Sequence, residues 1–149
     1  MGTLIVTWLV RYGHVLSGGL WVGGYALLAM VVMPRLQREV TAPLLSVTIA
    51  AVRLLTYVGT ATILFGLLLI TRTRGFATIM RGGEWSGIVI SCLVIAIALL
   101  GIGDGVLRPA LKRADKAGSL RRAQRWCWLA LILSVLAIGL MTRAIYAIS

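Results

Sequence analysis

Acidic residues, histidine and cysteine are all scarce in this sequence of 149 residues. Asp and Glu together number four, and there are one histidine and two cysteines. The sequence has no Ser-His-Asp set, no Cys-x-x-Cys motif and no glycine-rich phosphate loop. Hydrolytic and thiol-redox chemistry therefore find no support, and a single histidine excludes a bis-histidine haem within one chain. No enzyme class is predicted from these motifs.

Charged residues of both signs are also few. They make up 13% of the chain, whereas apolar residues make up 60%. Ordinary globular proteins contain about 25% charged and about 45–50% apolar residues. A soluble domain of this length could not bury so much apolar surface, so we expect lipid to surround the chain. The net charge is +11. The basic residues do not alternate with aromatic residues as they do in many nucleic-acid-binding proteins. They fit basic loops that flank membrane spans.

Four apolar stretches predict an all-α integral membrane four-helix bundle. The predicted spans cover residues 12–33, 54–71, 85–104 and 126–143. Each is close to the about 20 residues that cross about 30 Å of hydrocarbon. Backbone groups in lipid must be paired within their own segment, which favours helices over open strands. The chain is thus predicted to be a single transmembrane domain, residues 1–149.

Several residues at the span boundaries have specific expected roles. Pro34 cannot continue helical hydrogen bonding and should end the first helix, whereas Pro43 suits the first turn of the second. Thr41 is expected to cap the second helix and Ser119 the fourth. Two Gly-x-x-x-Gly pairs have the spacing that lets helix backbones approach closely: Gly19/Gly23 and Gly101/Gly105.

The distribution of Lys and Arg predicts the orientation. Ten of them lie on the side of the loops between spans 1 and 2 and between spans 3 and 4, and five on the other side. By the positive-inside rule, both termini should face outward and the 3–4 loop should face the cytoplasm. The expected location is the bacterial inner membrane, with membrane lipids as neighbours.

This orientation sorts the few candidate metal ligands by depth. The outer layer contains His14, Met80, Cys92 and Met141. Cys127 belongs to the inner layer, about ten residues of helix rise, or roughly 15 Å, from Cys92. A disulfide needs Cα atoms within about 7 Å, so both thiols should be free.

The only histidine begins a stripe that should face the bundle interior. His14 shares one helical face with Ser17, Gly18, Trp21 and Tyr25. Two interpretations of this histidine remain open. It is either an interfacial side chain bonded to a carbonyl or to water, or a ligand to a metal or to haem b.

Two groups of charged residues lie toward the inner side. Asp104 could pair with Arg108 at i+4 or with Arg53 at similar depth, and a proton relay is the alternative to such a structural pair. The segment 108–125 carries seven basic residues. Through Arg121, Arg122 and Arg125 it could dock on anionic lipid or on an acidic partner. A solvated loop that only sets topology is the alternative.

The first helix resembles a known family. His14, with Trp21 seven residues later and Gly23 and Gly24 directly after, is similar to the opening helix of the CopD-like copper-resistance membrane proteins. The stretches beginning at Arg53, Trp85 and Leu120 resemble the later helices of that family. The resemblance implies copper handling across the inner membrane and carries over His14, Trp21, Gly23 and Gly24. A lysine that family members often carry early in helix 3 is absent.

Three functions from different classes therefore remain open. The first is a CopD-like protein that binds Cu(I) through soft outer-layer groups. The second is a non-catalytic anchor or accessory subunit, either of a larger respiratory or photosynthetic complex or within a homo-oligomer. The third is a haem-binding protein, or a HemJ-like porphyrin oxidase, that uses His14. The segment Pro34-Arg35-Leu36 carries the likeness to the HemJ-like proteins, but it lies later than in those enzymes.

Overall fold

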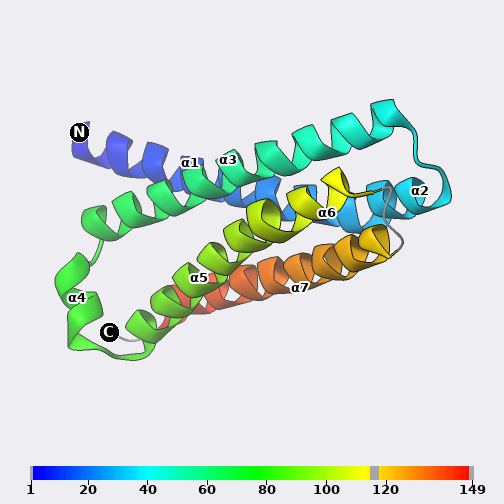
Figure 1. The fold of residues 1–149 in the computed structure, drawn as a ribbon. Helices are drawn as coiled ribbons and strands as arrows, with labels where there is room; N and C mark the ends of the chain where they lie inside the picture. Colours follow the sequence, from blue (N-terminus) through cyan, green and yellow to red (C-terminus); the bar gives the residue numbers. More distant parts are fainter. Residues whose placement is uncertain (1, 115–117, 148–149) are drawn as a thin grey trace.

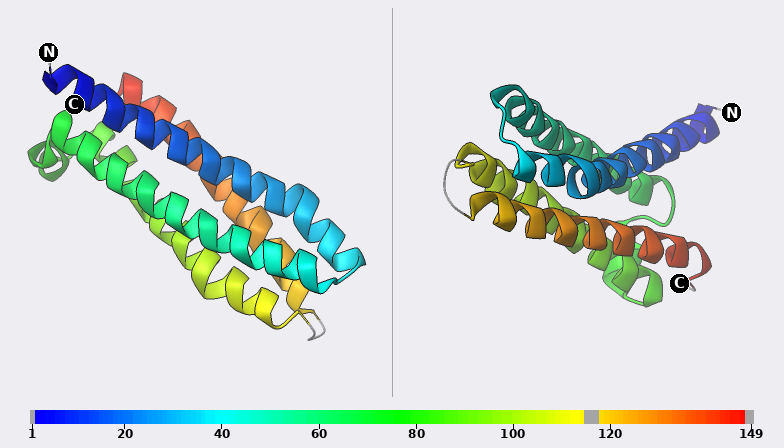
Figure 2. Two further views of the ribbon diagram at one scale, coloured as in Figure 1. Left: turned by 90° about the horizontal axis from the view of Figure 1, so that it is seen from above. Right: turned by 90° about the vertical axis from the view of Figure 1, so that its right-hand side faces the viewer.

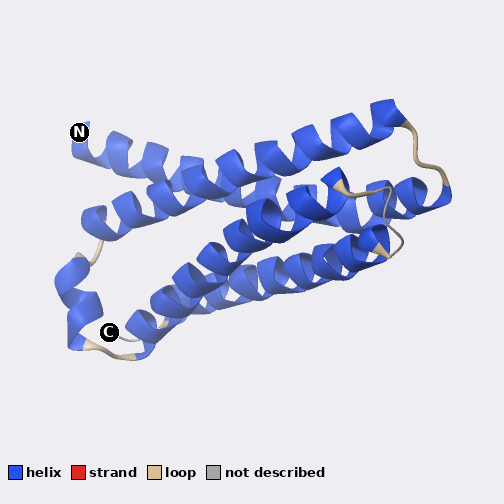
Figure 3. Ribbon diagram, in the orientation of Figure 1, coloured by secondary structure: helices blue, strands red, loops and turns tan. Residues whose placement is uncertain are grey.

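The computed structural model describes residues 2–114 and 118–147. These residues form helices joined by short loops, with no strand among them (Figure 3). In chain order the elements are α1 (Gly2–Leu27), the π-helical segment η1 (Leu28–Val32), α2 (Met33–Arg38), α3 (Ala42–Arg72), α4 (Phe76–Arg81), α5 (Glu84–Gly101), the π-helical segment η2 (Ile102–Leu107), α6 (Arg108–Lys112) and α7 (Ser119–Tyr146).

Four helical rods are long and apolar enough to cross a membrane, as the sequence predicted. They are Gly2–Arg38, Ala42–Arg72, Glu84–Lys112 and Ser119–Tyr146. Each rod contains its predicted span and extends beyond it. The short helix α4, which lies between the second and third rods, was not predicted.

The rods pack as two antiparallel hairpins. α1 packs mainly against α3, and α5 packs mainly against α7, while α1–α7 and α3–α5 contacts join the two hairpins (Figure 2). The start of α1, the end of α7 and the short α4 lie at one end, which we call the terminal end (Figure 1). The end that contains α2, α6 and the start of α7 is called the basic end.

The outer surface of the bundle is apolar along the middle of the rods. Large side chains on several rods are about half exposed, including Leu64 (57%), Ile97 (58%) and Ile132 (54%). A water-soluble protein does not leave contiguous apolar surface of this extent exposed. The chain is therefore a multi-pass membrane protein whose exposed flanks face hydrocarbon.

Pro34 does not end the first helix, contrary to the sequence prediction. The rod continues to Arg38 because the π-helical segment η1 precedes the proline, and η2 precedes Pro109 in the same way. In the i→i+5 pattern, the carbonyl of Ala29 would need an N–H from residue 34, which proline lacks. The side-chain amide of Gln124 in α7 donates to that carbonyl instead, at 2.8 Å.

One of the two predicted helix caps is present. The Thr41 hydroxyl accepts from the Leu44 N–H, and Pro43 lies in the first turn of α3, as predicted. The Ser119 prediction was wrong. Gly118 precedes α7 with φ 80°, a conformation that favours glycine, and the Ser119 hydroxyl donates to the Ala110 carbonyl. Ser119 thus ties α7 to α6.

The Gly-x-x-x-Gly pairs do not mediate close packing within the chain. A Cβ added at Gly19, Gly23, Gly101 or Gly105 would meet nothing within 4 Å. Close approaches occur at other glycines. A Cβ at Gly24 would lie 2.2 Å from Leu55, and one at Gly59 would lie 2.4 Å from Trp21. The rotation of each rod, which spacing alone does not fix, decides which glycines meet a neighbour.

The orientation in the membrane can be tested with single cysteines in a background lacking Cys92 and Cys127. Met80 in α4 is 87% exposed at the terminal end, and Lys112 is exposed at the basic end. We expect Met80→Cys to react with an impermeant thiol reagent on intact spheroplasts, and Lys112→Cys to react only after lysis. The reverse pattern would place the terminal end in the cytoplasm.

Candidate functional site

His14 lies half-buried between α1 and α3, where one of its ring nitrogens is occupied. Its Nδ1 is 2.9 Å from the Thr62 carbonyl oxygen. A carbonyl can only accept, so Nδ1 carries the proton in this contact, and in the neutral imidazole Nε2 is then the nitrogen with the lone pair. A histidine that ligates a metal commonly donates its other ring N–H to a carbonyl in this way. The arrangement satisfies the interfacial interpretation and leaves a ligand nitrogen available as well.

Glycines on both helices make room for this contact. A Cβ at Gly66 of α3 would lie 3.0 Å from His14 Cε1 and 3.3 Å from Nδ1. At the neighbouring position on each helix, a Cβ at Gly13 would lie 2.9 Å from the ring of Phe65. The two helices can therefore approach closely at the depth of His14. Thr62, Phe65 and Gly66 were not predicted as site residues, because their relation to His14 depends on how α3 is rotated.

The predicted bundle-facing stripe of α1 is confirmed. Ser17, Trp21 and Tyr25 are buried, and His14 and Gly18 are half-buried. The Ser17 hydroxyl donates to the Gly13 carbonyl at 2.7 Å, so it is satisfied within its own helix. This polar and aromatic face lines the interior from the terminal end to the middle of the bundle.

Cys92 and Met141 belong to the second hairpin. Cys92 is 5% exposed and Met141 packs against the same cluster, which also contains Trp85 and Val89. The Cys92 thiol donates weakly to the Ala137 carbonyl, with 3.8 Å between sulfur and oxygen. Both cysteines are free thiols, as predicted. The structure thus brings two of the predicted soft ligands into one cluster.

His14 and Met141 lie at similar distances along their rods from the basic end. His14 is 24 residues from Arg38, the last residue of its rod, and Met141 is 22 residues from Ser119, the first residue of α7 at the same end. At about 1.5 Å per residue these distances differ by about 3 Å. Cys92 is 20 residues from Lys112, which places it about 6 Å closer to the basic end along its rod than His14.

Met80 does not join this group. It lies on α4 with its side chain 87% exposed and belongs to neither buried cluster. Within residues 2–114 and 118–147, no three His, Cys, Asp or Glu side chains gather as a metal-binding group.

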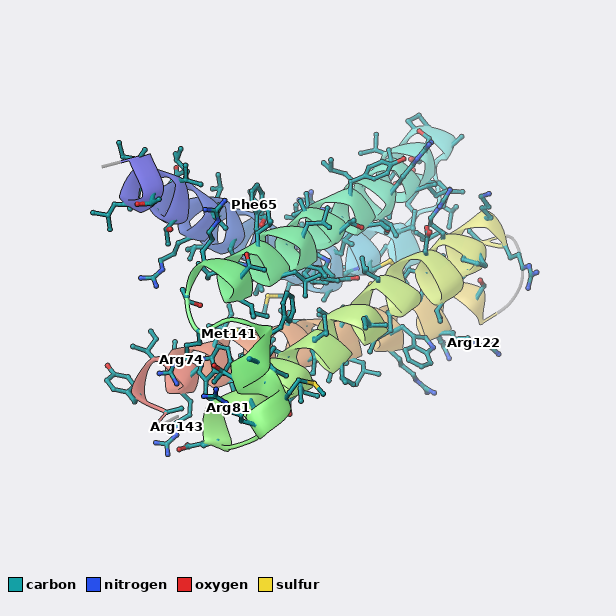
Figure 4. The ribbon with its side chains drawn as sticks, turned by 90° about the vertical axis from the view of Figure 1, so that its left-hand side faces the viewer. Phe65, Arg74, Arg81, Arg122, Met141 and Arg143 are labelled. Carbon is teal, nitrogen blue, oxygen red and sulfur yellow. The ribbon has the colours of Figure 1, made fainter. Side chains whose placement is uncertain are left out.

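Polar contacts fasten the terminal end of the second hairpin. Arg143 pairs with Glu84 at 2.7 Å, and Arg74 lies over the Trp85 ring at 5.2 Å. Figure 4 looks onto this end, with Arg74, Arg143 and Met141 on the lower side and Phe65 on the first hairpin above. These contacts connect the loop around α4 to the last turns of α7, close to Met141.

A second polar group lies deeper, toward the basic end. The Tyr25 hydroxyl donates to the Leu99 carbonyl at 2.9 Å, and a Cβ at Gly103 would lie 3.2 Å from that hydroxyl. Trp21 Nε1 and Gln124 Oε1 are buried without a hydrogen-bond partner. Gln124 was missed by the sequence analysis because it lies within the basic segment before the fourth predicted span. Its donor satisfies the Ala29 carbonyl, so its main role is structural.

Asp104 forms the structural ion pair that the sequence favoured. It pairs with Arg108 one turn later, and both side chains are partly exposed. Arg53 is not the partner. Its Nε donates to the Tyr57 hydroxyl at 3.1 Å on its own helix.

Of the three predicted docking arginines, two share a surface groove. Arg122 and Arg125 line a shallow groove between η2 and α7 together with Val106, Trp126 and Leu129. Arg121 is exposed but is not among these residues. Asp115 and Lys116, which belong to the same basic segment, lie outside the described residues.

No family model, curated protein or solved structure matches the chain.

Proposed function

We propose that this protein binds Cu(I) near the terminal end of the bundle, with His14 as a ligand, and that it handles copper at the outer face of the bacterial inner membrane. The observation that carries the proposal is the hydrogen bond from His14 Nδ1 to the Thr62 carbonyl. It orients the ring and leaves Nε2 as the ligand nitrogen.

The neighbouring chemistry suits Cu(I). Imidazole, thioether and thiolate groups are the ligands that this soft ion accepts. Met141 and Cys92 share one cluster on the opposite hairpin. Counted along the helices, Met141 is nearly as far from the basic end of its rod as His14 is from the basic end of its own. The resemblance of the first helix to the CopD-like family supports the same function.

The test is a Cu(I) titration of the purified protein in detergent under anaerobic conditions, in competition with a chromophoric chelator. Removing a residue that supports a metal ligand typically weakens metal binding about 10–100-fold. Removing the ligand itself should weaken binding at least as much. We therefore expect His14→Ala to weaken Cu(I) binding by more than about 10-fold, and the exposed Met80→Ala to leave it unchanged. Equal affinity in wild type and His14→Ala, or no Cu(I) bound by wild type, would contradict the proposal.

A second candidate is an accessory subunit of a larger membrane complex or a homo-oligomer. The observation in its favour is that the Gly19/Gly23 and Gly101/Gly105 faces meet no neighbour within the chain. Small residues in such an outward position permit another helix to approach. Co-purification of other subunits after mild solubilisation would favour this function. A haem absorption band that is lost in His14→Ala would favour a haem protein over both.

A further inference from the structure

The groove between η2 and α7 combines two basic side chains with an apolar lining. Arg122, Arg125, Trp126 and Leu129 follow one another at the spacing of a single face of α7, and Val106 lines the opposite side. Arg122 and Leu129 are seven residues apart, which is about 10 Å along the helix at 1.5 Å per residue. The charged part of the groove thus lies at the basic end, and the apolar part lies deeper in the membrane.

Among residues 2–114 and 118–147, neither arginine pairs with an acidic side chain. The ion pairs among the described residues are Arg108–Asp104 and Arg143–Glu84, so the nearest carboxylate along η2 is already paired. Arg122 lies on the outside of the second hairpin (Figure 4). The guanidinium group binds phosphate well because its fork of N–H donors matches two phosphate oxygens. Trp126 lies one turn deeper than Arg122, in the interfacial position that tryptophan favours.

We propose that this groove binds one anionic phospholipid from the leaflet at the basic end of the bundle. The lipid phosphate pairs with Arg122 and Arg125, and one acyl chain covers the apolar part of the groove. Two features favour a lipid over a soluble anion or an acidic protein. The charge gives way to apolar side chains in the direction of the membrane centre, and both arginines lie just before the fourth predicted span, whereas Leu129 lies inside it.

The experiment titrates the purified protein in neutral detergent with phosphatidylglycerol or phosphatidylcholine and counts bound lipids by native mass spectrometry. We expect one phosphatidylglycerol to bind in preference to phosphatidylcholine. Each basic residue contributes on the order of 1 kcal/mol to binding an anionic lipid. The variant Arg122→Gln/Arg125→Gln should therefore bind phosphatidylglycerol roughly 30-fold more weakly.

Two further variants separate a groove from diffuse surface charge. Arg38→Gln/Arg121→Gln removes the same charge from the same end of the bundle without touching the groove and should bind as wild type does. Val106→Trp keeps both arginines but fills the apolar part, and it should also lose the bound lipid. Circular dichroism and thermal unfolding should show that each variant is folded.

Four results would overturn the proposal. They are equal loss of lipid in the Arg38/Arg121 variant, undiminished binding in Val106→Trp, displacement of the lipid by soluble glycerol phosphate, and no preference over phosphatidylcholine. Either of the first two results would mean that diffuse electrostatic attraction, and not the groove, holds the lipid. The third would assign the arginines to a soluble phosphate ligand. The fourth would mean that Arg122 and Arg125 do not recognise an anionic lipid and would favour an acidic protein partner.

Discussion

Replacing Gly59 by alanine should lower the free energy of unfolding by about 1–3 kcal/mol, the usual cost of inserting a methyl group into a filled core. The added Cβ would lie 2.4 Å from Trp21 Cζ2 and 2.5 Å from Cε2, with Leu100 at 3.0 Å on another side. Trp21 is only 4% exposed, so its indole ring has no free space into which it can move. The strain therefore has to separate α1 from α3.

The matched control is Gly23→Ala. Gly23 lies in α1 close to Trp21, yet a Cβ there meets nothing within 4 Å. Alanine is favoured over glycine in helix interiors by up to about 1 kcal/mol, so this variant should be as stable as wild type or slightly more stable. Unfolding in micelles, followed by tryptophan fluorescence, measures both variants. Equal stability of the two would mean that Trp21 does not pack against Gly59 as the structure describes.

The sequence predicted the parts of the fold that depend on local composition. Span number and approximate position follow from apolar length, and the buried face of α1 follows from helical periodicity. The Thr41 cap was predictable because a cap involves residues only three positions apart. These features need no knowledge of how one helix faces another.

The errors concern contacts between distant residues. Pro34 was expected to end a helix, but it is accommodated because Gln124, which is 95 residues away, supplies a donor to the Ala29 carbonyl. The Gly-x-x-x-Gly pairs were expected to mediate packing, but the rotation of the rods directs them outward. Ser119 was expected to cap its own helix and instead bonds to Ala110 of α6. No local pattern contains this information.

The same division applies to the candidate site. His14 could be selected from the sequence because it is the only histidine and begins a bundle-facing stripe. The features that fix its ring could not be selected in this way, since they belong to another helix. They are the Thr62 carbonyl and the absence of a side chain at Gly66. The docking arginines show a similar limit. The charge cluster was evident in the sequence, but only the structure separates Arg121 from the two arginines that line the groove.

Replacing Gly66 by valine should weaken Cu(I) binding about 10–100-fold, the usual effect of losing a residue that orients a metal ligand. The Cβ alone would lie 3.0 Å from His14 Cε1 and 3.3 Å from Nδ1, and valine adds two methyl groups to it. The imidazole ring must then turn away from α3 and lose its bond to the Thr62 carbonyl. Nδ1 and Nε2 would no longer have separate, fixed roles.

Gly139→Val is the matched control, because Gly139 lies within α7 and a Cβ there meets nothing within 4 Å. It makes the same glycine-to-valine change in helix propensity without touching His14. Nitrogen-15 NMR of the histidine ring tests the geometry without any metal. Wild type and Gly139→Val should show a single tautomer protonated at Nδ1, and Gly66→Val should show a mixture of the two tautomers. If the tautomer persists in Gly66→Val, the glycine does not position the ring. If the tautomer is lost while Cu(I) affinity is unchanged, Gly66 does position the His14 ring, but His14 is not a ligand and the copper proposal fails.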